Sequence, residues 1–202
     1  MSDQDSYEVL ASQTRFRGRV IEVRVDDVRM SDGSVAEREL VAHPGAVAIV
    51  ALDDNGAIVL VNQYRPAVRA RLDELPAGLL DVDGEPALAA AKRELAEEAK
   101  LAADQWHVLV DLFSSPGMTD EAVRIFLARG LTAAGGDFAA ENEEIDMTVS
   151  REPLAEATRR VLTGAITNAS AVAGILAAVH GRATGWRELR PADAAWPARP
   201  GR

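Results

Sequence analysis

A cluster of glutamates with one arginine is the part of the sequence best suited to chemistry. The segment Arg93-Glu94-Leu95-Ala96-Glu97-Glu98 places Glu94 three residues before Glu97 and four before Glu98. Residues at these spacings share one face of a helix, so three carboxylates meet there. Carboxylate oxygens are the ligands that Mg²⁺ and Mn²⁺ take, commonly together with substrate phosphates. The alternative interpretation is a solvated acidic face.

A helix between Pro86 and Leu101 is expected to carry this cluster, and Pro86 suits its first turn. Apolar residues recur there at spacings of three and four, at Leu88, Ala91, Leu95 and Ala99. The cluster therefore falls near the C-terminal end of the helix, where the helix dipole and mutual repulsion both disfavour glutamates. A bound cation would offset both effects. The alternative is that neighbouring basic side chains offset them.

The residues around the cluster match a longer pattern. The chain has Gly78, six residues, Glu85, seven residues, and then the segment 93–98, followed by Lys100 and Leu101. This closely resembles the box of the Nudix hydrolase family, in which Gly, five residues, Glu and seven residues precede Arg-Glu-(aliphatic)-any-Glu-Glu-any-Gly-(aliphatic). The first spacer is one residue longer here, and Lys100 replaces the glycine. A left-handed residue often ends such a helix, so lysine predicts a strained or differently shaped cap.

The resemblance implies a fold and a set of roles. The implied fold is α/β, a Nudix-type α/β/α sandwich with a mixed central sheet and an N-terminal antiparallel β-hairpin region. Arg93 would orient a carboxylate through a salt bridge, and Glu85 would support the cluster through a hydrogen bond or a further metal. The cofactor would be Mg²⁺, with Mn²⁺ as the alternative. The ion would be held by the backbone carbonyl of Ala77 and by the carboxylates of Glu94, Glu97 and Glu98.

The implied reaction also needs a general base. Divalent cations neutralise a diphosphate and lower the pKa of bound water, while a further carboxylate takes the proton. In relatives that hydrolyse ADP-ribose, a glutamate on a later flexible loop has this role, and Glu141-Asn142-Glu143-Glu144 occupies a comparable place. Glu143 is favoured, Glu141 is second and Glu144 stays open. A solvated acidic loop is the alternative for each of them.

Residues outside the box resemble the ADP-ribose pyrophosphatase branch of the family. Pro116 lies sixteen residues beyond position 100, as a proline does in that branch. Arg65 is a candidate phosphate or ribose contact, because a guanidinium offers several donors to phosphate oxygens. Glu74 is a candidate substrate or metal-linked carboxylate. The alternative for Pro116 is an ordinary turn proline. Arg65 would otherwise form a surface salt bridge, and Glu74 would otherwise be a charge at the end of a strand.

The resemblance implies Mg²⁺-dependent hydrolysis of ADP-ribose to AMP and ribose 5-phosphate. Another nucleoside diphosphate sugar stays open as substrate, because aromatic residues make up only 4% of the chain and leave few candidates to stack on adenine. A noncatalytic nucleotide-binding module is the other alternative, against which the intact set of box carboxylates argues. Enzymes of this branch are usually homodimers in which an N-terminal sheet completes the partner's site, so a homodimer is expected.

The composition argues against several other classes of protein. The 202 residues carry 22 basic and 32 acidic side chains, a net charge of −10, which argues against nucleic acid as a partner. The absence of cysteine excludes disulfides and thiolate zinc sites. The longest apolar stretch, residues 171–179, is far shorter than the roughly 20 residues of a membrane span. Because the acidic N-terminus also lacks the features of a signal peptide, we expect a cytoplasmic protein.

The order of elements supports a division into three parts. Two hairpins are expected, 20–30 with 35–41 and 46–52 with 57–64. Further strands are expected at 106–113 and 122–127, and a mobile loop at 130–144. Two helices are expected after the loop, at 153–162 and 169–180. Residues 1–43 would form an N-terminal, dimer-forming β region, and residues 44–185 a Nudix domain. Residues 186–202 would be a tail that is disordered or docks a partner.

Overall fold

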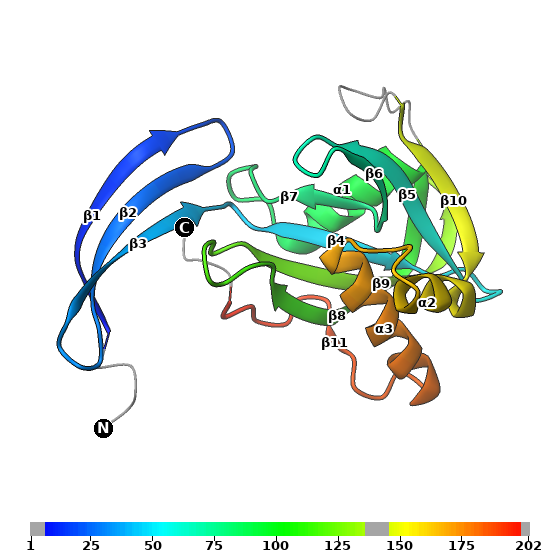
Figure 1. The fold of residues 1–202 in the computed structure, drawn as a ribbon. Helices are drawn as coiled ribbons and strands as arrows, with labels where there is room; N and C mark the ends of the chain where they lie inside the picture. The colour runs from blue at the N-terminus through cyan, green and yellow to red at the C-terminus, as the bar shows by residue number, and fades with distance from the viewer. Residues whose placement is uncertain (1–6, 136–145, 199–202) are drawn as a thin grey trace.

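The computed structural model describes residues 7–135 and 146–198 of the chain (Figure 1). Its first strands are β1 (Glu8–Arg17), β2 (Glu22–Arg29), β3 (Val35–Ala42), β4 (Ala46–Ala51), β5 (Ala57–Arg65), β6 (Ala70–Glu74) and β7 (Ala77–Leu79). The elements that follow are α1 (Ala87–Ala99), β8 (Leu101–Phe113), β9 (Ala122–Ala133), β10 (Thr148–Pro153), α2 (Leu154–Leu162), α3 (Ala169–Ala183) and β11 (Arg190–Pro191).

A mixed sheet lies at the centre of the fold, with the strand order β11-β8-β9-β4-β7. Strand β4 is parallel to β9 and antiparallel to β7, and the other pairings in this sheet are antiparallel. Helix α1 packs against one face, and α2 and α3 pack against the other. A second sheet has the order β10-β5-β6. The predicted α/β/α sandwich with a mixed sheet is confirmed.

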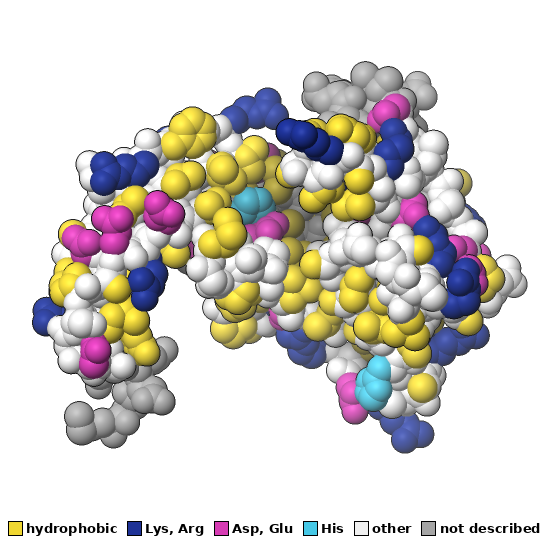
Figure 2. Space-filling view, in the orientation of Figure 1, with side chains coloured by type: hydrophobic (Ala, Val, Ile, Leu, Met, Phe, Trp, Pro, Cys, Tyr) yellow, Lys and Arg dark blue, Asp and Glu magenta, His cyan; other side chains and the backbone are white. Residues whose placement is uncertain are grey.

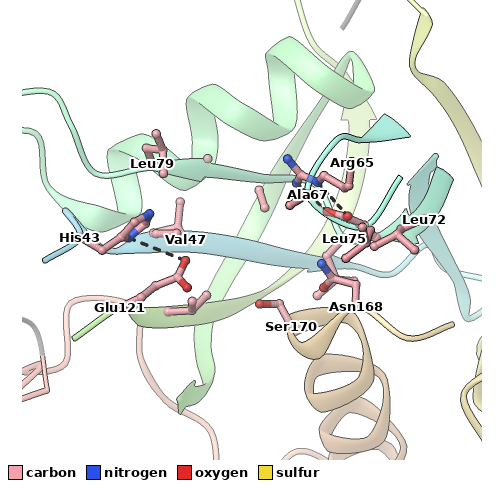
Figure 3. A pocket seen from close by; sticks show the side chains of 16 residues that line it. His43, Val47, Arg65, Ala67, Leu72, Leu75, Leu79, Glu121, Asn168 and Ser170 are labelled. Atoms are coloured by element: carbon pink, nitrogen blue, oxygen red, sulfur yellow. Dashed lines mark hydrogen bonds and ion pairs between the residues drawn. The ribbon is translucent and has the colours of Figure 1, made fainter. Parts of the chain in front are cut away.

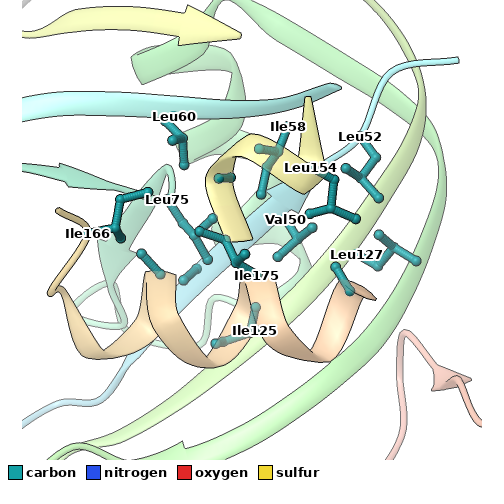
Figure 4. Packing of buried hydrophobic residues seen from close by; sticks show 14 of the residues in the cluster. Val50, Leu52, Ile58, Leu60, Leu75, Ile125, Leu127, Leu154, Ile166 and Ile175 are labelled. Carbon is teal, nitrogen blue, oxygen red and sulfur yellow. The ribbon is translucent and has the colours of Figure 1, made fainter. Parts of the chain in front are cut away.

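Strand β4 is apolar throughout because both of its faces are buried. Val47 and Ile49 point toward α1, while Ala48 and Val50 point toward α3 (Figure 4). Such a two-sided strand belongs in the interior of a sheet. Both edges of β4 are accordingly taken by β9 and β7, so the prediction that 46–52 and 57–64 pair as a hairpin is wrong except at one antiparallel bridge between Leu52 and Ile58 beside the turn. Both strands form, but β5 pairs with β6 and β10 in the second sheet.

The predicted helices are all present, with small changes at their ends. Helix α1 begins after Pro86, α2 covers the expected range, and α3 extends three residues beyond the expected end. The side chain of Asn168 caps α3 by accepting a hydrogen bond from the backbone N–H of Ala171, at 2.9 Å. Among the described residues, no helix is both long and apolar enough to cross a membrane.

Lys100 ends α1 in the left-handed conformation that the family pattern gives to glycine. Its φ is 56° and its ψ is 36°, and its backbone N–H bonds back to the last turn of the helix. A residue with a Cβ pays roughly 1–2 kcal/mol for this conformation. Of the two outcomes that the sequence left open, a strained cap and a differently shaped cap, the structure has the strained cap.

Replacing Lys100 with glycine is expected to raise the free energy of unfolding by roughly 0.5–1 kcal/mol, because relief of the strain exceeds the extra backbone entropy of glycine. Urea unfolding followed by circular dichroism would measure the change. Lys92→Gly is the matched control, since Lys92 is exposed within the same helix and glycine there costs about 1 kcal/mol. A loss of stability in both variants would contradict the assignment of strain to Lys100.

Strands β1, β2 and β3 form a separate sheet, which we call the N-terminal arm. The predicted hairpin of β2 and β3 is confirmed, but β1 has no counterpart among the predicted strands. All ten residues of β1 are exposed, so its sequence lacks the alternation of a half-buried strand. The arm curves away from the body and leaves a hollow beside it (Figures 1 and 2). Near its base, Val41 exchanges backbone hydrogen bonds with Met118 and Asp120.

The end of the chain packs on the protein itself, so the expectation that the tail is disordered is wrong for residues 187–198. Strand β11 pairs with β8 and caps that edge of the central sheet. Arg124 lies under Trp196, 4.7 Å from its ring centre, and donates hydrogen bonds to the carbonyls of Ala194 and Ala195. Residues 130–133, expected in a loop, continue β9; residues 136–145 lie outside the described part of the chain.

Candidate active site

The glutamate cluster of α1 is arranged around Arg93. The guanidinium of Arg93 donates two hydrogen bonds to Glu85, at 3.1 and 3.0 Å, from the loop before the helix. Its Nη1 atom also donates to Glu94 at 2.6 Å and to Glu97 at 3.0 Å. Bonding to Glu85, together with the charge of Glu94, raises the pKa of Arg93, and bonding to Arg93 lowers the pKa of Glu85. One cation thus holds three of the predicted carboxylates together.

The fourth carboxylate of the cluster faces β7. The Oε2 atom of Glu98 accepts a hydrogen bond from the backbone N–H of Ala77, at 2.9 Å. The carboxylate of Glu94 lies against the next residue of the strand, Gly78, and is only 2.0 Å from the point where a Cβ on Gly78 would stand. Glu94 is buried to a relative exposure of 9%. Helix α1 and β7 therefore contact each other at two of the three glutamates that were predicted to bind metal, Glu94 and Glu98.

The chemistry of these groups fits a hard divalent cation, because every donor is an oxygen and several carry charge. The glycine at position 78 leaves space for the Glu94 carboxylate beside the backbone of β7. In the part of the chain that the structure describes, no three acidic or histidine side chains are already grouped around one point as metal ligands. Arg93 holds two of the predicted ligands, so binding of a cation would require these side chains to turn.

A pocket of about 470 Å³ opens on the opposite side of the same strand segment (Figure 3). Ala77 and Gly78 line it together with Arg65 and Glu74, so three of the predicted site residues meet there. Arg65 donates to both carboxylate oxygens of Glu74, at 2.9 and 2.7 Å. Glu74 is almost fully buried, with a relative exposure of 2%, whereas 38% of the Arg65 side chain is exposed. The pair is a salt bridge that presents a guanidinium at the pocket.

Four polar residues of the pocket were not predicted from the sequence: His43, Glu121, Asn168 and Ser170. The Nδ1 atom of His43 lies 3.7 Å from Glu121 (Figure 3). Glu121 lies five residues after Pro116, which the sequence had already singled out, so its place in the chain was a usable signal. Asn168 and Ser170 come from the start of α3, about 90 residues further along the chain than Ala77. No local pattern joins such distant residues, so their meeting depends on the fold.

The remaining predicted residues lie elsewhere. Pro116 is in the predicted turn, but it lines a second pocket of about 210 Å³ beside β3 and not the pocket of Arg65 and Glu74. Glu141 and Glu143, the predicted bases, fall outside the described residues, as does Glu144. The described residue nearest to them on the C-terminal side is Asp146, whose carboxylate accepts a hydrogen bond from Arg71 of β6 at 2.7 Å.

Comparison with known proteins identifies the class of protein. A family model described as NUDIX domain matches residues 42–170, and one described as nucleoside diphosphate sugar hydrolase N-terminal domain matches residues 7–41. The chain belongs to the Nudix hydrolase family, which confirms the resemblance carried by the box residues, and it is a hydrolase.

Individual relatives of the chain include proteins named for their substrates. The chain is 52% identical to an ADP-ribose pyrophosphatase of Mycobacterium tuberculosis, over 99% of this chain and 95% of that protein. It is 39% identical to an ADP-ribose pyrophosphatase of Bacillus subtilis, over 62% of this chain and 67% of that protein. A crystal structure of an ADP compounds hydrolase matches with a TM-score of 0.76 and 25% identity, over 90% of this chain and 97% of that chain.

Proposed function

We propose that this chain hydrolyses the diphosphate linkage of ADP-ribose to AMP and ribose 5-phosphate, with Mg²⁺ as cofactor and Mn²⁺ as a substitute. The observation that carries the proposal is that the glutamates of α1 and the pocket contact the same two residues of β7. The N–H of Ala77 and the space at Gly78 receive Glu98 and Glu94 from α1, and the same two residues line the pocket. A diphosphate in that pocket would therefore be separated from the acidic face of the helix only by the backbone of β7.

The proposed chemistry assigns each residue a task. Water attacks one phosphorus atom, the bond from that phosphorus to the bridging oxygen breaks, and the other phosphate leaves. A cation held by Glu94, Glu97, Glu98 and the Ala77 carbonyl would supply charge neutralisation and a lowered pKa for water. Glu143, or else Glu141, would take the proton of the water. The ion pair of Arg71 with Asp146 ties the chain beyond these glutamates to β6.

The other site residues would hold the cluster and the substrate. Arg93 would keep Glu94 and Glu97 oriented, and Glu85 would keep Arg93 in place. Arg65 would contact a phosphate or the ribose, with its guanidinium fixed by the buried carboxylate of Glu74. Pro116 lines the adjoining pocket at β3, so any contact it makes with substrate would be at the end nearest the N-terminal arm.

We further propose that residues 1–43 mediate a homodimer and that the protein acts in the cytoplasm. The N-terminal arm exposes several large apolar side chains, namely Tyr7, Val9, Leu10, Phe16 and Val35. Exposed apolar residues gathered on one sheet are typical of a surface that is covered by a partner. Light scattering after size-exclusion chromatography would find a monomer if the proposal is wrong, and cell fractionation would check the location.

Hydrolysis of a panel of nucleoside diphosphate sugars would test the activity. With Mg²⁺ or Mn²⁺, ADP-ribose is expected to be the best substrate and to yield AMP and ribose 5-phosphate, identified by chromatography, and EDTA is expected to stop the reaction. Faster turnover of another sugar nucleotide would favour the alternative substrate. In support of that alternative, no phenylalanine, tyrosine or tryptophan is among the described residues that line the pocket of Arg65 and Glu74. Binding of ADP-ribose in calorimetry without any turnover would identify a noncatalytic module.

A further inference from the structure

A second site is built at the end of α3, away from the glutamate cluster. A cleft of about 150 Å³, which we call the arginine cleft, lies where the β4–β5 turn and β9 meet the end of α3. Its lining residues are Leu52, Asp53, Asp54, Gly56, Arg129, Arg182 and Trp186. None of these residues belongs to the candidate active site, so the cleft needs an explanation of its own.

Arg129 is held in this cleft by an aromatic ring. Its guanidinium lies 5.3 Å from the centre of the Trp186 ring. The ring packs on Gly181, where a Cβ would stand 2.6 Å from it, so Trp186 is fixed between α3 and the arginine. The Nε atom of Arg129 is buried, and it has no hydrogen-bond partner within the described chain. A buried donor without a partner is costly, typically by about 1–3 kcal/mol, which favours an acceptor from outside the chain.

A second guanidinium faces the same space. The Nη1 atom of Arg182 lies 2.6 Å from the point where a Cβ on Gly56 would stand, and the φ of Gly56 is 77°. A side chain at position 56 would therefore be strained and would displace Arg182. The positive φ and the missing side chain of this glycine bring the guanidinium of α3 close to the β4–β5 turn.

These two arginines differ from the arginines that the fold uses structurally. Arg65, Arg93 and Arg124 each donate two hydrogen bonds to a single carboxylate. The guanidinium groups of Arg129 and Arg182 form no hydrogen bond or ion pair with any residue that the structure describes. In a chain with ten more acidic than basic side chains, carboxylate partners are plentiful. Two guanidinium groups left unpaired in one cleft therefore suggest an anion that is not part of the chain.

Neither acidic residue of the cleft pairs with Arg129 or Arg182 among the described contacts. One carboxylate oxygen of Asp53 accepts the backbone N–H groups of Asn55 and Ala57, both at 2.9 Å, so that residue is committed to the turn. The other oxygen of Asp53 lies 3.8 Å from Arg151. Asp54 is exposed. The two guanidinium groups of the lining thus face one carboxylate that the turn and Arg151 already engage and one that is exposed.

We infer that the arginine cleft binds a phosphate group, either as inorganic phosphate or as the phosphate of a small phosphorylated molecule. Guanidinium groups bind phosphate oxygens with paired, charge-assisted hydrogen bonds. The cleft is well above the size needed for a single water but small for a nucleotide, which favours one phosphoryl group with little else attached. The inference does not depend on the proposed activity.

Nuclear magnetic resonance of the indole N–H groups offers a local test. The chain has three tryptophans, so ¹⁵N labelling gives three indole signals, and the one lost in Trp186→Phe belongs to the cleft. Titration with sodium phosphate at constant ionic strength, with EDTA present, is expected to shift the Trp186 signal saturably and to leave the other two in place. A titration with methyl phosphate separates the two sources, since tighter binding of it would favour a phosphorylated molecule over the free ion.

Arg182→Gln and Arg129→Gln are each expected to weaken the binding at least tenfold. Arg182 is exposed, so its variant is expected to fold even where the Arg129 variant does not. Arg159→Gln is the control, because Arg159 is an exposed arginine that pairs with Glu156 on α2. The absence of a saturable shift up to about 10 mM phosphate, or equal binding by Arg182→Gln, would overturn the inference and leave water as the partner of Arg129.

Discussion

Replacement of Glu98 by glutamine is expected to lower kcat by about 10³-fold, which corresponds to about 4 kcal/mol of transition-state stabilisation. The amide keeps the shape of the side chain, and its oxygen still accepts the hydrogen bond from the N–H of Ala77. Only the negative charge is lost, and that charge is what a metal ligand would supply. Steady-state kinetics with ADP-ribose and Mg²⁺ would measure the effect.

The fold of this variant is expected to be unaffected. Glu98 is four residues from Glu94 and adjacent to Glu97 on the same helix, so removal of its charge relieves repulsion. Thermal unfolding would check this, and added Mg²⁺ is expected to raise the Tm of the wild type but to have much less effect on the variant, because a bound ligand stabilises the folded state. Glu156→Gln, on the exposed side of α2, is the control. Unchanged kcat in Glu98→Gln would refute the metal assignment.

The glutamate cluster could be found from the sequence because it is local. Residues 85–98 form one helix and its approach, and the spacing of their charges fixes which side chains share a face. What the sequence could not give is the position of Arg93 relative to its neighbours. The spacing leaves open which carboxylate Arg93 holds, and in the structure it binds Glu85, Glu94 and Glu97 together.

The pairing of strands was harder to predict than the strands themselves. The turn at residues 53–56 is real, and Gly56 has the positive φ that such a turn requires. It joins two sheets here, however, because β9 returns from residue 122 to take the edge of β4 that a hairpin partner would need. The pocket depends on the same long-range contact, since Glu121 precedes β9 directly. The end of the chain was misjudged for a similar reason, because Trp196 and its partner Arg124 are 72 residues apart in the sequence.

Replacement of Gly78 by alanine is expected to lower kcat about 10²-fold at a small cost in stability. The new Cβ would lie 2.0 Å from the carboxylate of Glu94 and 2.5 Å from its Cγ atom, far inside van der Waals contact. The Glu94 side chain is flexible, so it can turn away, and the free energy of unfolding is expected to fall by about 1 kcal/mol. A displacement of roughly 1 Å in a group that positions the reacting atoms is enough for a 10²-fold loss.

Gly174→Ala is the control that separates this effect from general damage to the fold. A Cβ at Gly174 would stand 2.8 Å from Leu75 and 2.9 Å from Val50, so it crowds the core without touching Glu94. This variant is expected to lose at least as much stability as Gly78→Ala but to keep kcat, per folded molecule, within a few fold of the wild type. Equal loss of kcat in both variants would mean that activity follows stability. If Gly78→Ala instead loses less stability but more kcat than Gly174→Ala, the loss of activity comes from the displaced Glu94 carboxylate beside β7.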